Sequence, residues 1–217
     1  LFYIVLKMRR LGVLVAVLLL AATPVLGYFE RGEESPYQAI ADYHSPIIFI
    51  PGIMGSTLVD NAGWETWPGY LQMDRSALRL NDDGKTQFNK GSKITPTVPI
   101  RSKYGSGIYK SFYEFMDKGP YTFRGKSGKF GWMGKAYFDH AYDFRLDNNV
   151  QIEGPGVEKT LKEDIDEILK KTHSDKVIIL AHSMGGYQAR MFAAKYPDKV
   201  RAVVFLSSPH RGAPKVF

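Results

Sequence analysis

The chain has 217 residues, of which 44% are hydrophobic and 24% charged, and its formal net charge is +7. A chain of this length and apolar content can bury one sizeable core. It contains no cysteine, which excludes disulfides, thiolate metal sites and thiol redox chemistry. The positive charge comes without a long basic run or a nucleic-acid-binding motif, so nucleic acid is not an expected partner.

The first 27 residues have the pattern of a secretory signal. Residues 1–7 precede the first methionine, Met8, which opens a short basic segment. An apolar run over 11–22 follows, and small residues lead to Gly27. This pattern predicts a signal peptide that is cleaved after Gly27, and therefore a secreted or lumenal protein. The alternative is an uncleaved N-terminal membrane anchor, although the run over 11–22 is short for one.

A short apolar run over 46–50 predicts a buried strand, and the Pro-Gly-x-x-Gly loop of 51–55 follows it directly. Glycines in such a loop let the backbone approach a ligand closely. We therefore single out the backbone N–H of Ile53 as a donor to a bound anion. The alternative is an ordinary turn that ends a strand, and the choice depends on what lies beside the loop.

Residues 57–136 form a long insertion that is rich in aromatic side chains. A plain connection between two strands needs far fewer residues. Helical spacing of apolar residues predicts a helix over about 108–117. Trp64 and Trp67 follow the glycine loop closely, and they are candidates for contact with a lipid surface, with ordinary packing as the alternative.

The next elements expected are a strand over about 137–143 and a helix over 157–171. Asp143 and Arg145 would share a face of that strand, which favours a structural ion pair. His140 and Asp143 would lie on different faces of the strand, and no further ligand cluster accompanies them. We therefore expect neither a metal site nor a cofactor.

Residues 177–194 hold the most informative pattern in the chain. An apolar strand over 176–181 leads into a small-x-Ser-x-Gly turn at Ser183, and a helix over 184–196 follows. Such a strand, turn and helix present a nucleophilic serine at the end of a parallel sheet. The backbone N–H of Met184, helped by the helix dipole, would hold an oxyanion together with that of Ile53. A serine that caps an ordinary helix is the alternative, but it does not explain two glycines after Ser183.

A last strand is predicted over 200–206. The alternation of strands and helices predicts an α/β fold, with a mostly parallel sheet and helices on both faces. The loop of 207–214 holds His210, the only histidine after Ser183. Because His210 follows the strand directly, we interpret it as a loop residue near the site and not as the general base.

Four motifs occur in an order that resembles the lecithin:cholesterol acyltransferase (LCAT) family, which includes lysosomal phospholipase A2: PIIFIPGIMGSTL, AYDFR, AHSMGG and SSPHRGAP. The resemblance covers the chain from about Pro46 onward, with Phe144 where the family has tryptophan. It implies an α/β-hydrolase fold for residues 28–217. It also implies a serine esterase that acts on glycerolipid or phospholipid acyl esters at a lipid–water interface. The acyl group would pass through an acyl-enzyme to water or to an alcohol.

In α/β hydrolases the triad acid and histidine follow the serine, on loops after later strands. Only 34 residues follow Ser183. We therefore expect the domain to be C-terminally truncated in this chain, with the triad Asp and His beyond residue 217 and the fragment itself inactive. Two alternatives stay open, a lipase that removes the acyl chain from a lipid anchor and a non-catalytic lipid-binding product.

Overall fold

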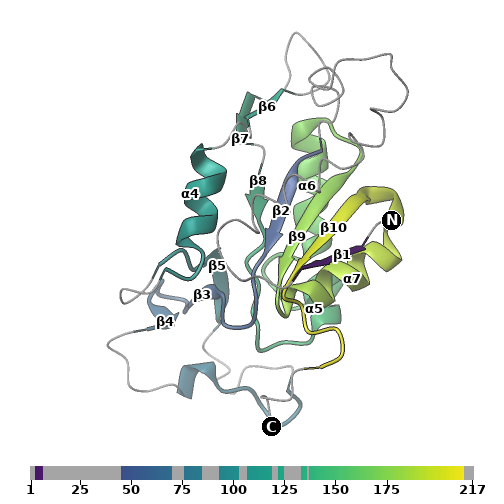
Figure 1. Ribbon diagram of the computed structural model, residues 1–217. Helices are drawn as coiled ribbons and strands as arrows, with labels where there is room; N and C mark the ends of the chain where they lie inside the picture. The colour runs from purple at the N-terminus through teal and green to yellow at the C-terminus, as the bar shows by residue number, and fades with distance from the viewer. Residues whose placement is uncertain are drawn as a thin grey trace, which may run out of the picture.

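The computed structural model describes residues 3–6, 45–69, 76–84, 93–102, 107–118, 122–124, 133–135 and 137–212. Its main sheet contains five parallel strands in the order β1-β10-β9-β2-β8 (Figure 1). Their bounds are Tyr3–Leu6 for β1, Ile47–Ile50 for β2, Tyr137–Asp139 for β8, Val177–His182 for β9 and Val200–Leu206 for β10. An all-parallel sheet is the arrangement predicted by the alternation of strands and helices.

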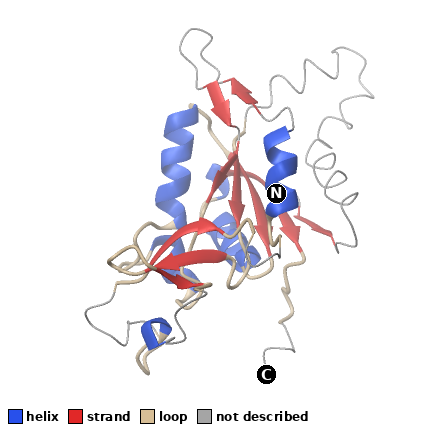
Figure 2. Cartoon of the chain, turned by 90° about the vertical axis from the view of Figure 1, so that its left-hand side faces the viewer, coloured by secondary structure: helices blue, strands red, loops and turns tan. Residues whose placement is uncertain are grey.

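Helices cover both faces of this sheet (Figures 1 and 2). Helix α4, Lys110–Lys118, packs on one face, and α6, Leu161–Thr172, and α7, Gly185–Lys195, pack on the other. The chain passes from β2 through α4 to β8 in one direction along the sheet, and from β8 through α6 to β9 in the opposite direction. Because β-α-β crossovers are right-handed, reversing the direction puts the next helix on the opposite face.

Strand β2 is apolar on both sides because it is covered on both faces. Phe49 packs against Tyr109 and Phe112 beside α4. Ile48 and Ile50 point the other way, into the core formed with α6 and α7. All four residues of the strand are buried, as expected for a central strand of a parallel sheet.

The aromatic-rich insertion contains a second, antiparallel sheet at the end of β2, with strand order β4-β3-β5. It consists of β3, Ser56–Val59, β4, Glu65–Trp67, and β5, Thr95–Pro99. The insertion also holds α4 and the two-stranded β6–β7 pair, Thr122–Arg124 with Met133–Lys135. The N–H of Ile100 donates to the carbonyl of Gly55 at 2.8 Å, so β5 continues to the glycine loop.

The strand predicted over 137–143 ends at Asp139, so the AYDFR motif lies in a loop and a turn. The carboxylate of Asp143 accepts a hydrogen bond from the backbone N–H of Arg145 at 3.1 Å, which turns the chain away from the sheet. The prediction that Asp143 and Arg145 share a strand face is therefore wrong. The predicted ion pair is confirmed, with 2.5 Å between Nη2 of Arg145 and Oδ2 of Asp143.

The helix predicted over 157–171 begins four residues later, at Leu161. Thr160 is its N-cap, and its hydroxyl accepts a bond from the N–H of Glu163 while the Glu163 carboxylate accepts one from the N–H of Thr160. This capping box fixes the start of the helix more firmly than the apolar spacing does. A short helix that the sequence analysis did not predict, α5, Asn148–Glu153, precedes it.

Strand β1, Tyr3–Leu6, lies beside β10 in the main sheet. It comes from the segment upstream of the predicted signal peptide, for which no part in the fold was expected. Residues 8–27, which carry that prediction, lie outside the described residues. Over the described residues, no helix is both long enough and apolar enough to cross a membrane.

Candidate active site

Ser183 occupies a sharp turn between β9 and α7. Its φ of 50° lies in the left-handed region, which costs a non-glycine residue on the order of 1–3 kcal/mol. The neighbouring strand holds the turn in place, because the N–H of Ser183 donates to the carbonyl of Leu206 at 2.9 Å. A serine held in a strained conformation at the end of a parallel strand is the geometry that α/β hydrolases use for their nucleophile.

The two glycines after the serine are required by close packing. A Cβ on Gly185 would lie 2.5 Å from the carbonyl oxygen of Pro51 and 2.7 Å from that of Ile50. A Cβ on Gly186 would lie 2.1 Å from the hydroxyl of Ser208. The start of helix α7 therefore lies so close to the ends of β2 and β10 that a side chain at Gly185 or Gly186 would clash with them. An ordinary N-cap serine has no need of this approach.

The Pro-Gly-x-x-Gly loop lies directly against the serine turn. A Cβ on Gly52 would lie 2.9 Å from Cβ of Ser183. The loop folds as a β-turn, in which the N–H of Gly55 donates to the carbonyl of Gly52 at 3.0 Å and Met54 has a φ of 60°. The loop follows β2 and lies beside β9, and the connections that leave these two neighbouring strands run in opposite directions across the sheet. Ligands of open α/β sheets bind at the carboxyl ends of the strands at such a point.

Hydrogen bonding around the loop limits which backbone donors remain free. The N–H of Gly52 donates to the hydroxyl of Tyr109 at 2.8 Å, and that of Gly55 is used within the turn. For the N–H groups of Ile53 and Met184, the described part of the chain provides no hydrogen-bond acceptor. Met184 follows Ser183 directly, and Ile53 follows Gly52, which lies against the serine turn. The role of these two donors at an oxyanion stays a prediction.

A family profile for the alpha/beta hydrolase fold matches residues 133–215, a range that includes AYDFR and the serine turn. Over 85 residues the chain is 31% identical to phospholipase A(1) LCAT3 of Arabidopsis thaliana. Together the two matches support an α/β-hydrolase fold and a likeness to the LCAT family. This confirms the fold class and the family resemblance. The match covers 37% of this chain and 18% of the length of that relative.

Three histidines of this hydrolase occupy distinct places around the sheet. His182 is next to the serine, and its Nδ1 lies 2.9 Å from the hydroxyl of Tyr109. His210 packs edge-on against Phe205, with 4.5 Å between ring centroids, and also against the ring of Tyr187. Burial lowers the pKa of both histidines, and the charge of a nearby arginine lowers the pKa of His210 further. Among the described residues neither imidazole has a hydrogen bond to Ser183.

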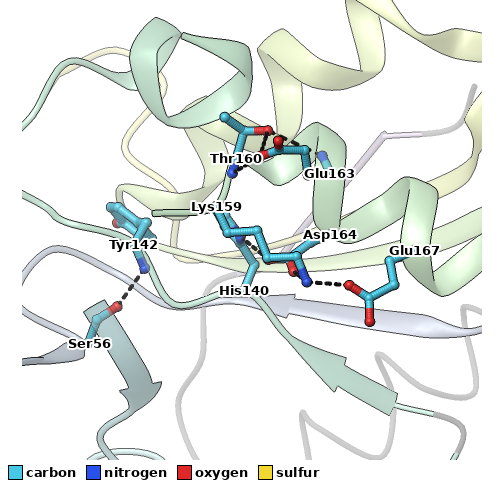
Figure 3. A network of polar contacts seen from close by, with 8 residues as sticks. All are labelled: Ser56, His140, Tyr142, Lys159, Thr160, Glu163, Asp164 and Glu167. Atoms are coloured by element: carbon cyan, nitrogen blue, oxygen red, sulfur yellow. Dashed lines mark hydrogen bonds and ion pairs between the residues drawn. The ribbon is translucent and has the colours of Figure 1, made fainter. Parts of the chain in front are cut away.

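His140 forms a buried pair with Asp164 of α6, with 2.6 Å between Nδ1 and Oδ2 (Figure 3). Such a pair resembles the acid and base of a catalytic triad. His140, however, follows β8, which is separated from β9 by β2. Two strand spacings amount to about 10 Å, which is too far for a hydrogen bond to Ser183. The pair therefore fastens α6 to the sheet. No local pattern in the sequence indicates this pair, because 24 residues separate the two partners.

Trp64 and Trp67 have different environments. The ring of Trp64 is 68% exposed. Trp67 is half-buried, its Nε1–H donates to the carbonyl of Met54, and its ring meets that of Phe144 edge-on at 5.7 Å. Trp67 thus connects the glycine loop to AYDFR, whereas Trp64 presents its ring to solvent. Tyr109, which the sequence analysis treated as a core residue, contributes a hydroxyl to the same loop.

Proposed function

We propose that this α/β hydrolase, at its full natural length, is a serine esterase or lipase that cleaves acyl esters of glycerolipids or phospholipids. The observation that carries the proposal is the placement of Ser183, strained at φ 50° and in contact with the glycine loop. A serine in this position is accessible to an ester carbonyl at the end of the sheet. The backbone N–H groups of Met184, the next residue, and of Ile53, in the adjoining glycine loop, are the donors that we assign to its oxyanion.

The chemistry we infer is acyl transfer through a covalent intermediate. The hydroxyl oxygen of Ser183 attacks the ester carbonyl, and the N–H groups of Ile53 and Met184 stabilise the tetrahedral oxyanion. Collapse of this intermediate expels the alcohol and leaves an acyl-enzyme. Water or a second alcohol then attacks the acyl-enzyme, releases the acyl product and restores the serine hydroxyl.

A general base must take the serine proton, and an acid must orient that base. Three of the described histidines are engaged elsewhere: His140 bonds Asp164, His182 bonds Tyr109, and His210 packs between aromatic rings. In α/β hydrolases the base and the acid lie on loops that follow later strands of the sheet.

A lipid substrate is favoured by two observations. The relative from Arabidopsis is named as a phospholipase. The loop beside Ser183 also exposes large apolar side chains, since Ile53 is 53% and Met54 46% exposed, and the exposed Trp64 directly precedes β4 of the adjoining small sheet. Exposed apolar side chains around a site mark contact with an apolar ligand or surface. We further infer a secreted or lumenal location, which depends on the signal pattern of residues 8–27.

The experiment that tests this function compares full-length wild type with Ser183→Ala. A fluorophosphonate probe is expected to label the wild type and to spare the variant, and ester turnover is expected to fall by several orders of magnitude. Ser207→Ala is a matched control, because Ser207 also has a left-handed φ of 51° but follows β10. Equal labelling of wild type and Ser183→Ala would refute the assignment, and absence of both labelling and turnover in the wild type would favour a non-catalytic lipid-binding protein.

A further inference from the structure

The hydroxyl of Tyr109 lies between the glycine loop and the residue that precedes the serine. It accepts a hydrogen bond from the N–H of Gly52 at 2.8 Å, and it lies 2.9 Å from Nδ1 of His182. The ring of Tyr109 is buried and meets the ring of Phe49 edge-on at 5.0 Å. Packing therefore fixes the position of this hydroxyl, and 57 and 73 residues separate it from its two partners.

One arrangement of protons satisfies both the Tyr109 hydroxyl and Nδ1 of His182. The Tyr109 oxygen already accepts the Gly52 N–H, so its own proton is free to donate to Nδ1 of His182. His182 must then be neutral, with its proton on Nε2. Burial lowers the pKa of His182, which favours this neutral form. Burial also raises the pKa of Tyr109, although the Gly52 N–H opposes that shift, so the hydroxyl keeps its proton.

Gly52 is held from two further directions. A Cβ at Gly52 would lie 2.8 Å from Nδ1 of His182 and 2.9 Å from Cβ of Ser183. The carbonyl of Gly52 accepts the N–H of Gly55. The orientation of this residue determines where the next peptide N–H, that of Ile53, points. The Tyr109 hydroxyl therefore controls the direction of the loop donor relative to the serine.

We propose that Tyr109 and His182 form a positioning pair that holds the glycine loop against the serine turn, so that the Ile53 N–H is aimed at the developing oxyanion. This inference rests on the proposed acyl-transfer function of Ser183. Neither side chain touches the substrate in this role. The chain of contacts runs from His182 to Tyr109, then to Gly52 and Ile53, and it joins the two loops that form the site.

The pair should act on the transition state and not on substrate binding. An oxyanion donor is useful only when it lies about 2.7–3.1 Å from the oxyanion, and losing one such donor lowers kcat by about 100-fold to 1,000-fold. Misplacing the donor should cost less than losing it. We therefore expect Tyr109→Phe to lower kcat by about 10-fold to 100-fold, with KM changed by less than about 2-fold, because ground-state binding does not use this contact.

The test measures kcat and KM of the full-length protein on a soluble short-chain ester, together with the Ki of a trifluoromethyl ketone. Such a ketone adds to the serine and forms a tetrahedral oxyanion, so its Ki reports on the oxyanion donors. For Tyr109→Phe the Ki is expected to rise in parallel with the fall in kcat. Tyr113→Phe is the matched control. Tyr113 lies on α4, which begins directly after Tyr109, and is also buried, but its hydroxyl bonds Asp139 at 2.6 Å and not the loop.

Two His182 variants separate positioning from simple packing. His182→Leu removes the acceptor and is expected to match Tyr109→Phe, whereas His182→Asn keeps an acceptor at the place of Nδ1 and is expected to restore most of kcat. The double variant Tyr109→Phe/His182→Leu should be no worse than either single variant, because both remove the same interaction. If Tyr109→Phe fails to fold, the comparison of His182→Leu with His182→Asn decides the question alone.

Wild-type kcat and Ki in Tyr109→Phe would overturn the inference, and so would a rise in KM with kcat unchanged. Equal losses in His182→Asn and His182→Leu would also overturn it, since only packing would then matter. Failure of the underlying function is recognised separately. In that case Ser183→Ala retains turnover and probe labelling, a result that does not depend on any variant of Tyr109 or His182.

Discussion

The indole Nε1–H of Trp67 donates a hydrogen bond of 3.0 Å to the carbonyl oxygen of Met54. Met54 belongs to the turn that carries the proposed oxyanion donor, and Trp67 belongs to β4 of the small sheet. The small sheet therefore supports the loop beside Ser183 through Met54, whereas Tyr109 holds the same loop through Gly52. Trp64, three residues earlier, has its ring exposed.

We therefore expect Trp64 and Trp67 to contribute to different properties, vesicle binding and turnover respectively. Trp64→Ala is expected to weaken co-sedimentation with phospholipid vesicles while soluble-ester turnover stays near wild type, because an exposed aromatic ring contributes at the lipid interface. Trp67→Ala is expected to lower soluble-ester turnover, since it releases the Met54 carbonyl. Vesicle co-sedimentation and soluble-ester kinetics of the two single variants check this. Equal behaviour of the two variants in both assays would contradict it.

Gly185→Ala should be destabilising, in spite of the better helix propensity of alanine. Propensity alone predicts a gain of up to about 1 kcal/mol. The new Cβ would lie within 2.7 Å of the carbonyl oxygens of Ile50 and Pro51, which are backbone atoms and cannot rotate away. We expect a net loss of about 1–3 kcal/mol in the free energy of unfolding. Turnover should fall as well, because relieving the clash displaces the loop.

Urea unfolding of the two proteins measures this change, and Arg190→Ala is the control on the same helix. Arg190 is exposed, so its replacement should change the free energy of unfolding by less than about 0.5 kcal/mol. A Gly185→Ala protein that is as stable as the wild type, or more so, would show that α7 does not need this close approach.

The ion pair in the AYDFR turn should be sensitive to truncation of the arginine. The side chains of Asp143 and Arg145 are 3% and 8% exposed, and the guanidinium also donates to the carbonyl of Leu78 at 3.0 Å. Arg145→Met leaves a buried carboxylate without its partner, which should cost about 3–5 kcal/mol. Arg145→Lys should recover only part of this, since an ammonium lacks the planar fork.

The control for Arg145 is an exposed ion pair. Lys93 pairs with Glu158, and their side chains are 61% and 51% exposed. Lys93→Ala should therefore cost less than about 1 kcal/mol. Urea unfolding measures all three variants under the same conditions. Equal losses for Arg145→Met and Lys93→Ala would mean that the buried pair adds nothing beyond an exposed one.

The His140–Asp164 pair should make stability depend on pH in the acid range. Burial raises the pKa of Asp164, but hydrogen bonds and charge from His140 and Lys159 outweigh it and hold the pKa below its ordinary value. A carboxyl whose pKa is lowered by folding stabilises the folded state above its unfolded value, about 3.9. That contribution is lost as the pH falls through the lower folded pKa.

Asp164→Asn should therefore reduce the free energy of unfolding at pH 6 and flatten its decline between about pH 4 and pH 2. Urea unfolding across this range measures the slopes, with the exposed Asp82→Asn as the control. Parallel pH profiles for wild type and Asp164→Asn would show that the carboxylate is not stabilised by folding.

Local patterns in the sequence determined the central strands and the nucleophile turn. The apolar runs over 46–50, 176–181 and 200–206 became β2, β9 and β10 with small shifts of their ends. This worked because strands buried on both faces must be apolar throughout. The turn at Ser183 was equally readable, because a tight turn and a close helix approach demand glycines at fixed positions.

Local patterns were less reliable where polar side chains decide the backbone. Asp143 ends the extended segment by accepting the N–H of Arg145, and Thr160 with Glu163 sets the start of α6. The Thr-x-x-Glu pattern was present in the sequence and could have been used. The turn at Asp143 could not be distinguished from a strand by alternation alone.

Only the tertiary structure decided which distant residues meet around Ser183. The contacts of Gly52 with Ser183, of Tyr109 with His182 and of His140 with Asp164 depend on strand order and on which face each helix covers. Apolar periodicity predicts that a side chain such as Tyr109 is buried, but it does not predict which atoms the hydroxyl contacts. The sequence therefore specified the strained turn at Ser183 through local backbone constraints, whereas the support around it arises from side chains that only the packing of the sheet brings together.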